Sequence, residues 1–167
     1  MALVIEDGTG KTDSNSFVTA AEAIKYAGDR GFSFPSVTAD VEKLLIKACD
    51  FILGLENKFQ GLRTEQNQRM PFPRVRVLIF NNVDYIAFDE IPERVKEAQM
   101  RFAVSAHTSE LRPDGTGQEV INEKVGPLQV QYAERGSGSV TPQFNQAMDL
   151  IAPFFENEGG QLIVDRA

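Results

Sequence analysis

Residues 91–111 constrain the fold most, because this stretch has both a helix start and a continuous apolar face. Pro92 is expected at the first helical position, where a backbone N–H would have no acceptor within the helix, so its absence costs nothing. Glu93 follows in the first turn, where the helix dipole favours a carboxylate. The apolar positions recur at helical spacing, at Val95, Ala98, Phe102 and Ala106. We expect a core helix with no catalytic role, against which the other helices pack.

Two earlier segments also carry helix signals. Thr19 and Glu22 have the spacing of a capping box, which predicts a first helix over residues 20–27. Thr38 can cap a second helix. The apolar stripe of that helix comprises Val41, Leu44, Leu45, Ala48, Cys49, Ile52 and Leu53.

A last helix is predicted after Thr141, with Pro142 in its first position. Its apolar face comprises Phe144, Ala147, Met148, Ile151, Phe154 and Phe155. Pro153 falls inside this run and should bend or end the helix. The four segments together predict a mainly α fold, a small helical bundle of about four helices with a tethered C-terminal helix.

One or two short β-hairpins are predicted between the helices. Residues 74–80 read as a strand that turns at Asn81-Asn82 into residues 83–88. Further on, Gly126-Pro127 leads into residues 128–132, where apolar and polar residues alternate. A two-stranded element leaves unpaired edges, which pair either within the chain or with a neighbouring subunit.

The domain organisation follows from these elements. Residues 1–135 are expected to form a helical core with a hairpin, and the Gly-Ser-rich residues 136–140 a linker. Residues 141–167 would then be a C-terminal amphipathic helix and tail, belonging either to the same domain or to an arm that docks on a partner. A chain of 167 residues with 42% apolar content suits one domain.

The charge limits the possible partners. A net charge of −7 argues against a free-standing duplex-binding protein, which needs Lys and Arg to replace phosphate counterions. The basic residues concentrate at Arg63, Arg69, Arg74 and Arg76. On an isolated subunit they would be ordinary surface charge; in a ring they would line a channel or contact an acidic neighbour. We expect no secretory signal and no contact with a membrane.

The sequence favours no catalytic chemistry. Gly10-Lys11-Thr12 resembles a phosphate-binding loop, but Ile5 occupies the position of that motif's first glycine. His107 is the only histidine and has no ligand-spaced partner for a metal. Cys49 is the only cysteine, so no disulfide forms within the chain. We expect no enzyme, no catalytic residue, no cofactor and no metal.

Five short segments carry a resemblance to a known family: residues 7–10, 14–18, 72–74, 91–92 and 123–127. With them the chain resembles the head-tail connector, or head-completion adaptor, proteins of tailed bacteriophages. The resemblance covers nearly the whole chain. Some relatives carry a different label, DnaT-like single-stranded-DNA-binding protein.

The connector resemblance implies a virion protein of the phage neck, assembled in the host cytoplasm as a ring of about twelve copies. Its partners would be other copies of itself, the portal protein, downstream tail or neck proteins, and genomic DNA passing without sequence-specific binding during packaging and ejection. The subunit interface would involve Val125, Leu128, Val130, Tyr132, Arg63, Arg74 and Arg76. Docking to the portal would involve Phe144, Met148, Ile151, Phe154 and Phe155.

The alternative is a single-stranded-DNA-binding protein of a phage replication system. It rests on the second label and on the arginine concentration. It lacks a basic groove with interleaved aromatic residues, on which such binding generally depends.

Overall fold

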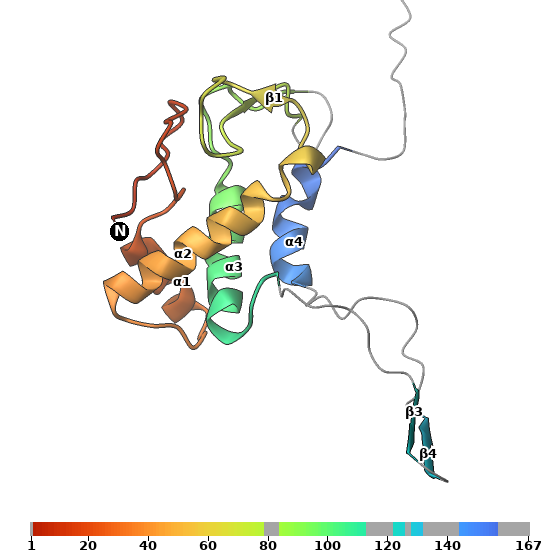
Figure 1. Cartoon of the computed structure of the whole chain (residues 1–167). Coiled ribbons are helices and arrows are strands. Elements are labelled where there is room, and N and C mark those ends of the chain that lie inside the picture. The colour runs from red at the N-terminus through yellow and green to blue at the C-terminus, as the bar shows by residue number, and fades with distance from the viewer. Residues whose placement is uncertain (1, 79–83, 113–121, 126–127, 132–143, 157–167) are drawn as a thin grey trace, which may run out of the picture. The chain divides into compact units, whose positions relative to one another are not determined.

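The computed structural model describes residues 2–78, 84–112, 122–125, 128–131 and 144–156 (Figure 1). Its helices are α1 (Ala20–Asp29), α2 (Thr38–Leu53), α3 (Glu93–Thr108) and α4 (Asn145–Ile151), with single 3-10 turns at η1 (Glu56–Lys58) and η2 (Ala152–Phe154). The fold is mainly helical, which confirms the predicted class. The described residues as far as Leu111, together with those from Phe144 onward, form one compact unit; a second unit spans Arg112–Gln143.

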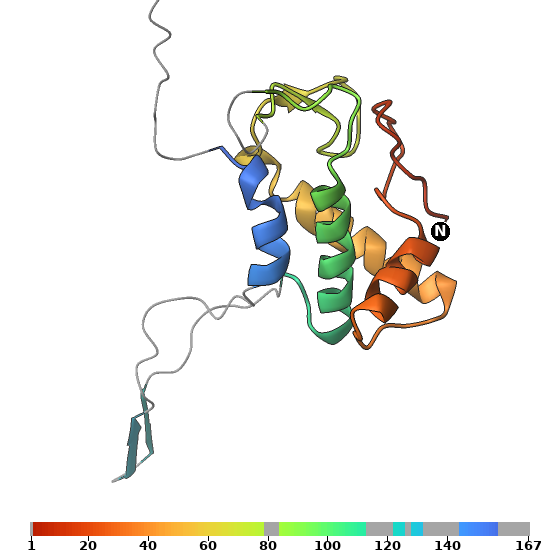
Figure 2. The same ribbon diagram turned by 180° about the vertical axis from the view of Figure 1, so that it is seen from behind.

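Helix α3 is the centre of the first unit. It packs most extensively against α2 and α4, and α1 contacts both α2 and α3 (Figures 1 and 2). Val95, Ala98 and Phe102 are completely buried, as their helical spacing predicts. Because Ala98 has almost no side chain, neighbouring backbones can pack close to this face.

The start of α1 confirms its sequence signal, whereas the starts of α2 and α3 are shifted by one residue. The expected start of the last helix, at Thr141 and Pro142, lies outside the described residues, and α4 begins at Asn145. Thr19 and Glu22 form the predicted capping box, in which the Thr19 N–H donates to the Glu22 carboxylate at 2.7 Å and the Glu22 N–H donates to Thr19 Oγ1 at 3.2 Å. The expected cap at Thr38 is wrong. Val37 is the extended residue before α2 and has no capping side chain, and Thr38 is already helical. Pro92 likewise precedes α3 rather than opening it.

Gln99 is a polar residue that lies among the apolar side chains of this core. Gln99 of α3 is fully buried, and its Oε1 accepts a hydrogen bond from the Phe17 N–H at 2.8 Å. Its Nε2 donates to Ser16 Oγ at 2.9 Å and to the Leu45 carbonyl at 3.1 Å. Since every polar atom of the amide is bonded, the residue ties the N-terminal segment to α2 and α3 without an unpaired group.

The predicted hairpin between residues 74 and 88 forms only in part. Strand β2 (Arg74–Val75) pairs antiparallel with β1 (Leu62–Arg63) rather than with residues 83–88. A single bridge joins Leu78 to Tyr85, and the expected turn at Asn81-Asn82 lies outside the described residues. The strand stops at Arg76 because this residue adopts a left-handed conformation, with φ at 62°.

The segment that follows α4 is hydrogen-bonded to the chain at the end of η1 and just after it. Phe155 and Phe59 form an antiparallel bridge, and the Glu156 N–H donates to the Lys58 carbonyl at 2.7 Å. The Gln60 amide donates to two carbonyls of the segment that follows α4, at 3.2 and 2.9 Å. We call this set of contacts the C-terminal clasp.

The second unit contains the predicted hairpin. Strands β3 (Asn122–Val125) and β4 (Leu128–Gln131) pair antiparallel, with Val125 opposite Leu128 and Glu123 opposite Val130. The linker expected at residues 136–140 lies outside the described residues. The structure therefore pairs these strands with each other, and an additional strand from a neighbouring subunit stays a prediction.

Candidate functional site

The glycine-containing loop near the N-terminus closes around a carboxylate of its own chain. Glu6 is almost fully buried; its Oε1 accepts hydrogen bonds from the Gly8 N–H at 3.1 Å and the Gly10 N–H at 2.9 Å. Its Oε2 accepts from the Lys11 N–H at 2.8 Å and from Ser14 Oγ at 2.9 Å. Converging N–H groups of this kind make an anion-binding nest.

The nest has no room for a phosphate. The Glu6 carboxylate already occupies the donors that would bind one, and the Lys11 ammonium is held by Asp7 at 2.8 Å and by the Ile5 carbonyl at 2.9 Å. Gly8, at φ 101°, packs so closely on the distant segment that contains Asp89 that an added Cβ would lie 1.9 Å from the Asp89 carbonyl oxygen. The loop therefore has a structural role, in agreement with the incomplete match of its sequence to a phosphate-binding loop.

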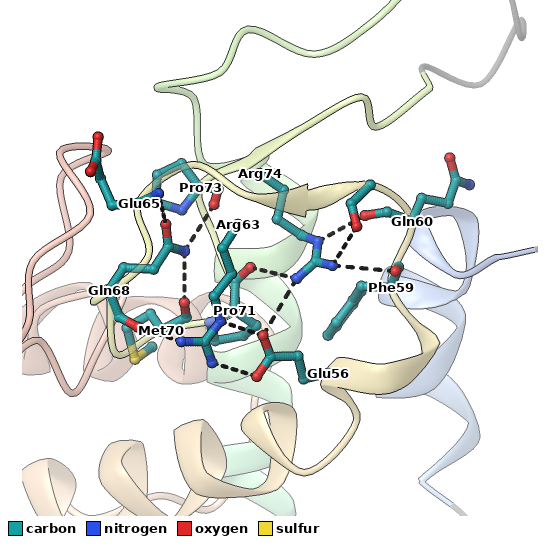
Figure 3. A network of polar contacts seen from close by, with 11 residues as sticks. Glu56, Phe59, Gln60, Arg63, Glu65, Gln68, Met70, Pro71, Pro73 and Arg74 are labelled. Atoms are coloured by element: carbon teal, nitrogen blue, oxygen red, sulfur yellow. Dashed lines mark hydrogen bonds and ion pairs between the residues drawn. The ribbon is translucent and has the colours of Figure 1, made fainter.

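Arg74 is the centre of a second internal network, shown in Figure 3. Only 6% of Arg74 is exposed, and its guanidinium donates to four backbone carbonyls. The acceptors are the carbonyls of Gln60 at 2.8 Å, Gly61 at 2.8 Å, Pro71 at 3.2 Å and Phe59 at 3.4 Å. Burial lowers the pKa of Arg74 below its ordinary value. The side chain holds the loop before β1 against β2.

Arg63 joins this network through Glu56. Its Nε and Nη2 donate to the two carboxylate oxygens of Glu56, and its Nη1 donates to the Gln68 carbonyl (Figure 3). These hydrogen bonds to the Glu56 carboxylate raise the pKa of Arg63. Glu56 also lies 3.7 Å from Arg74 Nη1. We call Glu56, Arg63 and Arg74 the arginine brace, whose charges contact groups of the same chain.

Arg76 lies differently from the two arginines of the brace. It is exposed, and among the described residues no hydrogen bond or ion pair involves its guanidinium. The Leu78–Tyr85 bridge, continued by the hydrogen bond from the Ile86 N–H to the Val77 carbonyl at 2.9 Å, sets the register between the two segments. Arg76 lies just before the two residues that make these contacts, Val77 and Leu78.

The segment that pairs with Val77 and Leu78 carries two exposed aromatic residues. Tyr85 and Phe88 are each 62% exposed. Thr64 Oγ1 donates to the Phe88 carbonyl at 2.7 Å, which fixes the backbone of this segment to the chain after β1. We call the side chains of Arg76, Tyr85 and Phe88 the 76–88 patch. Exposed carboxylates adjoin it in the sequence, at Asp84, Asp89 and Glu90.

The residues expected to dock on a portal pack on the chain's own core. Ile151 and Phe154 are buried, and Phe144, Met148 and Phe155 are partly buried against the same core. The ring centroids of Phe155 and Phe59 are 5.1 Å apart. Docking of a portal on this face stays a prediction, as does a subunit contact through Val125, Leu128, Val130, Arg63, Arg74 and Arg76. Tyr132 lies outside the described residues.

A pocket of about 240 Å³ lies between α1 and α3. Its charged lining is mixed: Glu22, Lys25, Asp29, Arg30, Glu93, Lys96 and Glu97. Arg30 lies 3.6 Å from Glu97 and stacks 3.8 Å above the Tyr26 ring, so part of this charge is paired across the pocket. The mixed lining favours neither an anionic nor a cationic ligand.

The described ranges contain neither a metal-ligand cluster nor a helix that could span a membrane. Within them, no group of three or more His, Cys, Asp or Glu side chains could hold a metal ion. None of the helices that the structure describes is both long and apolar enough to cross a bilayer.

One family model matches the chain, over residues 1–167, with the description "Putative DnaT-like ssDNA binding protein". No curated protein matches it. No solved structure matches it either. The family description supports the single-stranded-DNA-binding alternative better than a connector, and the match gives no support to a portal, a tail or a ring of fixed size.

Proposed function

We propose that this chain, which belongs to the DnaT-like ssDNA-binding family, binds single-stranded DNA. The observation that carries the proposal is the extent of the family match, which includes every residue of the chain. The family description does not say which residues contact DNA.

The charge of the chain determines what kind of DNA binding is possible. With a net charge of −7, and with Arg63 and Arg74 engaged in the brace, the chain has little charge with which to replace phosphate counterions. Unpaired bases offer a second source of affinity, because every base can stack on an aromatic side chain. We expect selective binding to single strands and weak binding to duplex.

Fluorescence anisotropy of the full chain tests this proposal. A labelled oligothymidine and a labelled hairpin duplex of equal length are titrated with protein at low salt. Saturable binding of the single strand, at least tenfold tighter than binding of the duplex, is the expected result. Equal affinity for both, or no binding to the single strand, contradicts it.

A connector role is the second candidate, and a different observation favours it. The strands β3 and β4 belong to a unit separate from the helices, and each has only the other as a partner among the described residues. Hairpins of this kind can pair with a neighbouring copy in a ring. In this proposal the chain joins portal to tail in the virion neck, after assembly in the host cytoplasm.

Light scattering distinguishes the connector from the first candidate. A ring, or a monomer that joins its cognate portal in ring stoichiometry, supports the connector. A monomer that does not bind the portal but binds a labelled single strand contradicts the connector proposal.

Neither candidate includes catalysis, and we propose that the chain is not an enzyme. The expected result of a nucleotide-turnover assay is no turnover above buffer, unchanged in Lys11→Ala. Turnover that is lost in Lys11→Ala contradicts the structural role assigned to the nest.

A further inference from the structure

We propose that the 76–88 patch is the place where the chain holds single-stranded DNA, with Tyr85 and Phe88 stacking on unpaired bases and Arg76 contacting a phosphate. The inference rests on the proposed function and adds a site and a mode of binding to it. The family match assigns no residue to such a role.

The exposure of the two rings is the first argument. Among the described residues, the mostly exposed large apolar side chains are Val37, Leu62, Tyr85 and Phe88, so two of the four are aromatic. The other described phenylalanines pack against the core or lie partly covered near it. Tyr85 and Phe88 stand three positions apart on one segment, where both rings are accessible to a ligand.

The segment that carries the rings is held by its backbone, which is the second argument. The Ile86 N–H donates to Val77, and Thr64 Oγ1 donates to the Phe88 carbonyl. The Glu90 N–H closes a turn on the Ala87 carbonyl at 3.1 Å. A platform that is already ordered loses less entropy when a ligand binds.

Arg76 supplies the third argument. Its left-handed backbone is uncommon for a residue with a side chain. Gly61 lies close to this segment, since a Cβ on Gly61 would lie 2.0 Å from the Val75 carbonyl oxygen and 3.1 Å from that of Arg76. Glycine at position 61 therefore allows the two segments to approach closely. The Arg76 guanidinium is exposed, and Arg76 lies two residues before the bridge that joins Leu78 to Tyr85.

The neighbouring acids define how the site can work. Asp84, Asp89 and Glu90 repel phosphates, and one arginine cannot neutralise a long stretch of backbone. Stacking must therefore supply most of the affinity. With about one phosphate contact, log Kd should change with log salt by a slope of only about 0.7. A groove built on many basic residues would give a slope several times larger.

Substitution by leucine tests the stacking. Tyr85→Leu and Phe88→Leu keep apolar bulk at the surface and remove the aromatic face. In the anisotropy titration with oligothymidine, each should weaken binding by about 5- to 150-fold, the range for loss of one stacked base. Tyr85→Phe keeps the ring and should bind like the wild type. Val37→Leu, at the exposed start of α2, is the matched control and should change nothing.

Arg76→Gly tests the phosphate contact. Glycine accepts a positive φ, so this variant removes the guanidinium and keeps the backbone. We expect a loss of a few-fold and a salt slope close to zero. Thermal melting of every variant shows that the fold is intact. Photocrosslinking of an oligonucleotide containing 5-bromouracil should label the peptide that contains residues 84–90.

The outcomes separate this site from the proposed function. If the wild type binds single strands and the folded double leucine variant binds equally well, the site is wrong and the function stands. If the wild type binds no single strand, both are wrong. If the double variant changes the particle mass in light scattering while its DNA affinity is unchanged, the patch is a protein–protein contact and the DNA site is wrong.

Discussion

The arginine brace and the 76–88 patch use the same kind of residue in opposite ways, although Arg74 and Arg76 are only two positions apart. Arg74 is buried and has its guanidinium bonded to four carbonyls of its own chain. Arg76 is exposed in a left-handed conformation. The comparison teaches that a concentration of arginines in a sequence does not measure the charge available to a ligand. Part of that charge stabilises the fold, and only the remainder faces solvent.

The largest effect should come from removing Arg74. In Arg74→Ala, the carbonyls it binds lose their donor and Glu56 loses a nearby positive charge, so we expect the free energy of unfolding to fall by about 3–5 kcal/mol. Urea denaturation followed by circular dichroism measures this. Arg76→Gly is the matched comparison and should change stability by no more than about 0.5 kcal/mol. Equal losses in the two variants would remove the distinction between the regions.

Gly61→Ala should also have a large effect, because position 61 joins the brace to the patch. The new Cβ would lie 2.0 Å from the Val75 carbonyl oxygen, at a residue whose φ is 70°. We expect a loss of about 2–4 kcal/mol.

Gly31→Ala is the matched control for that substitution. Its φ is 67°, but nothing lies within 4 Å of the added atom, so it should lose only the conformational part, about 1 kcal/mol. A thermal melt compares the two variants. Similar losses would mean that the chain tolerates separation of residues 61 and 75.

Glu6→Gln extends the comparison to the N-terminal nest, where the buried Glu6 carboxylate, like Arg74, is hydrogen-bonded to its own chain. The variant keeps the shape of the side chain, but an amide NH₂ would face N–H donors. We expect a loss of about 1–3 kcal/mol in urea denaturation. Asp13→Asn, in the same loop but outside the nest, is the control. A stable Glu6→Gln protein would indicate that the nest is held by its glycines alone.

The smallest effect concerns the exposed pair of Asp7 and Lys11. The hydrogen bond from Lys11, followed by that from Thr9, lowers the pKa of Asp7 from 3.8 to about 2. Because the folded pKa is the lower one, the stabilisation is present above pH 4 and is lost as the pH falls through about 2. A carboxyl-carbon NMR titration should show this pKa, and Lys11→Met should move it back toward 3.8. The melting temperature of that variant should hardly change.

The helices could be predicted from the sequence because their signals are local. The capping box of Thr19 and Glu22, the apolar stripe of α2 and the small residues of α3 need no knowledge of distant segments. The offsets at Thr38 and Pro92 are single residues, as expected where a helix start has no capping side chain.

The candidate site could not be predicted in the same way, because it depends on contacts between distant segments. The burial of Arg74 follows from the path of the chain at residues 59–61, and the burial of Gln99 from its contact with Phe17. Tyr85 and Phe88 lay in a predicted strand, where a sequence does not tell which aromatic residues face solvent. The nest gave one local signal, an acid followed by two glycines, but the occupant of the nest is visible only in the structure.

The C-terminal clasp gives the chain a mechanical connection that its helices alone would lack. Glu156 is the last residue that the structure describes; its N–H donates to the Lys58 carbonyl, and the neighbouring Gln60 carbonyl accepts a hydrogen bond from Arg74 Nε. A force applied at Glu156 would therefore act on α4 and also, through Lys58 and Gln60, on the buried Arg74.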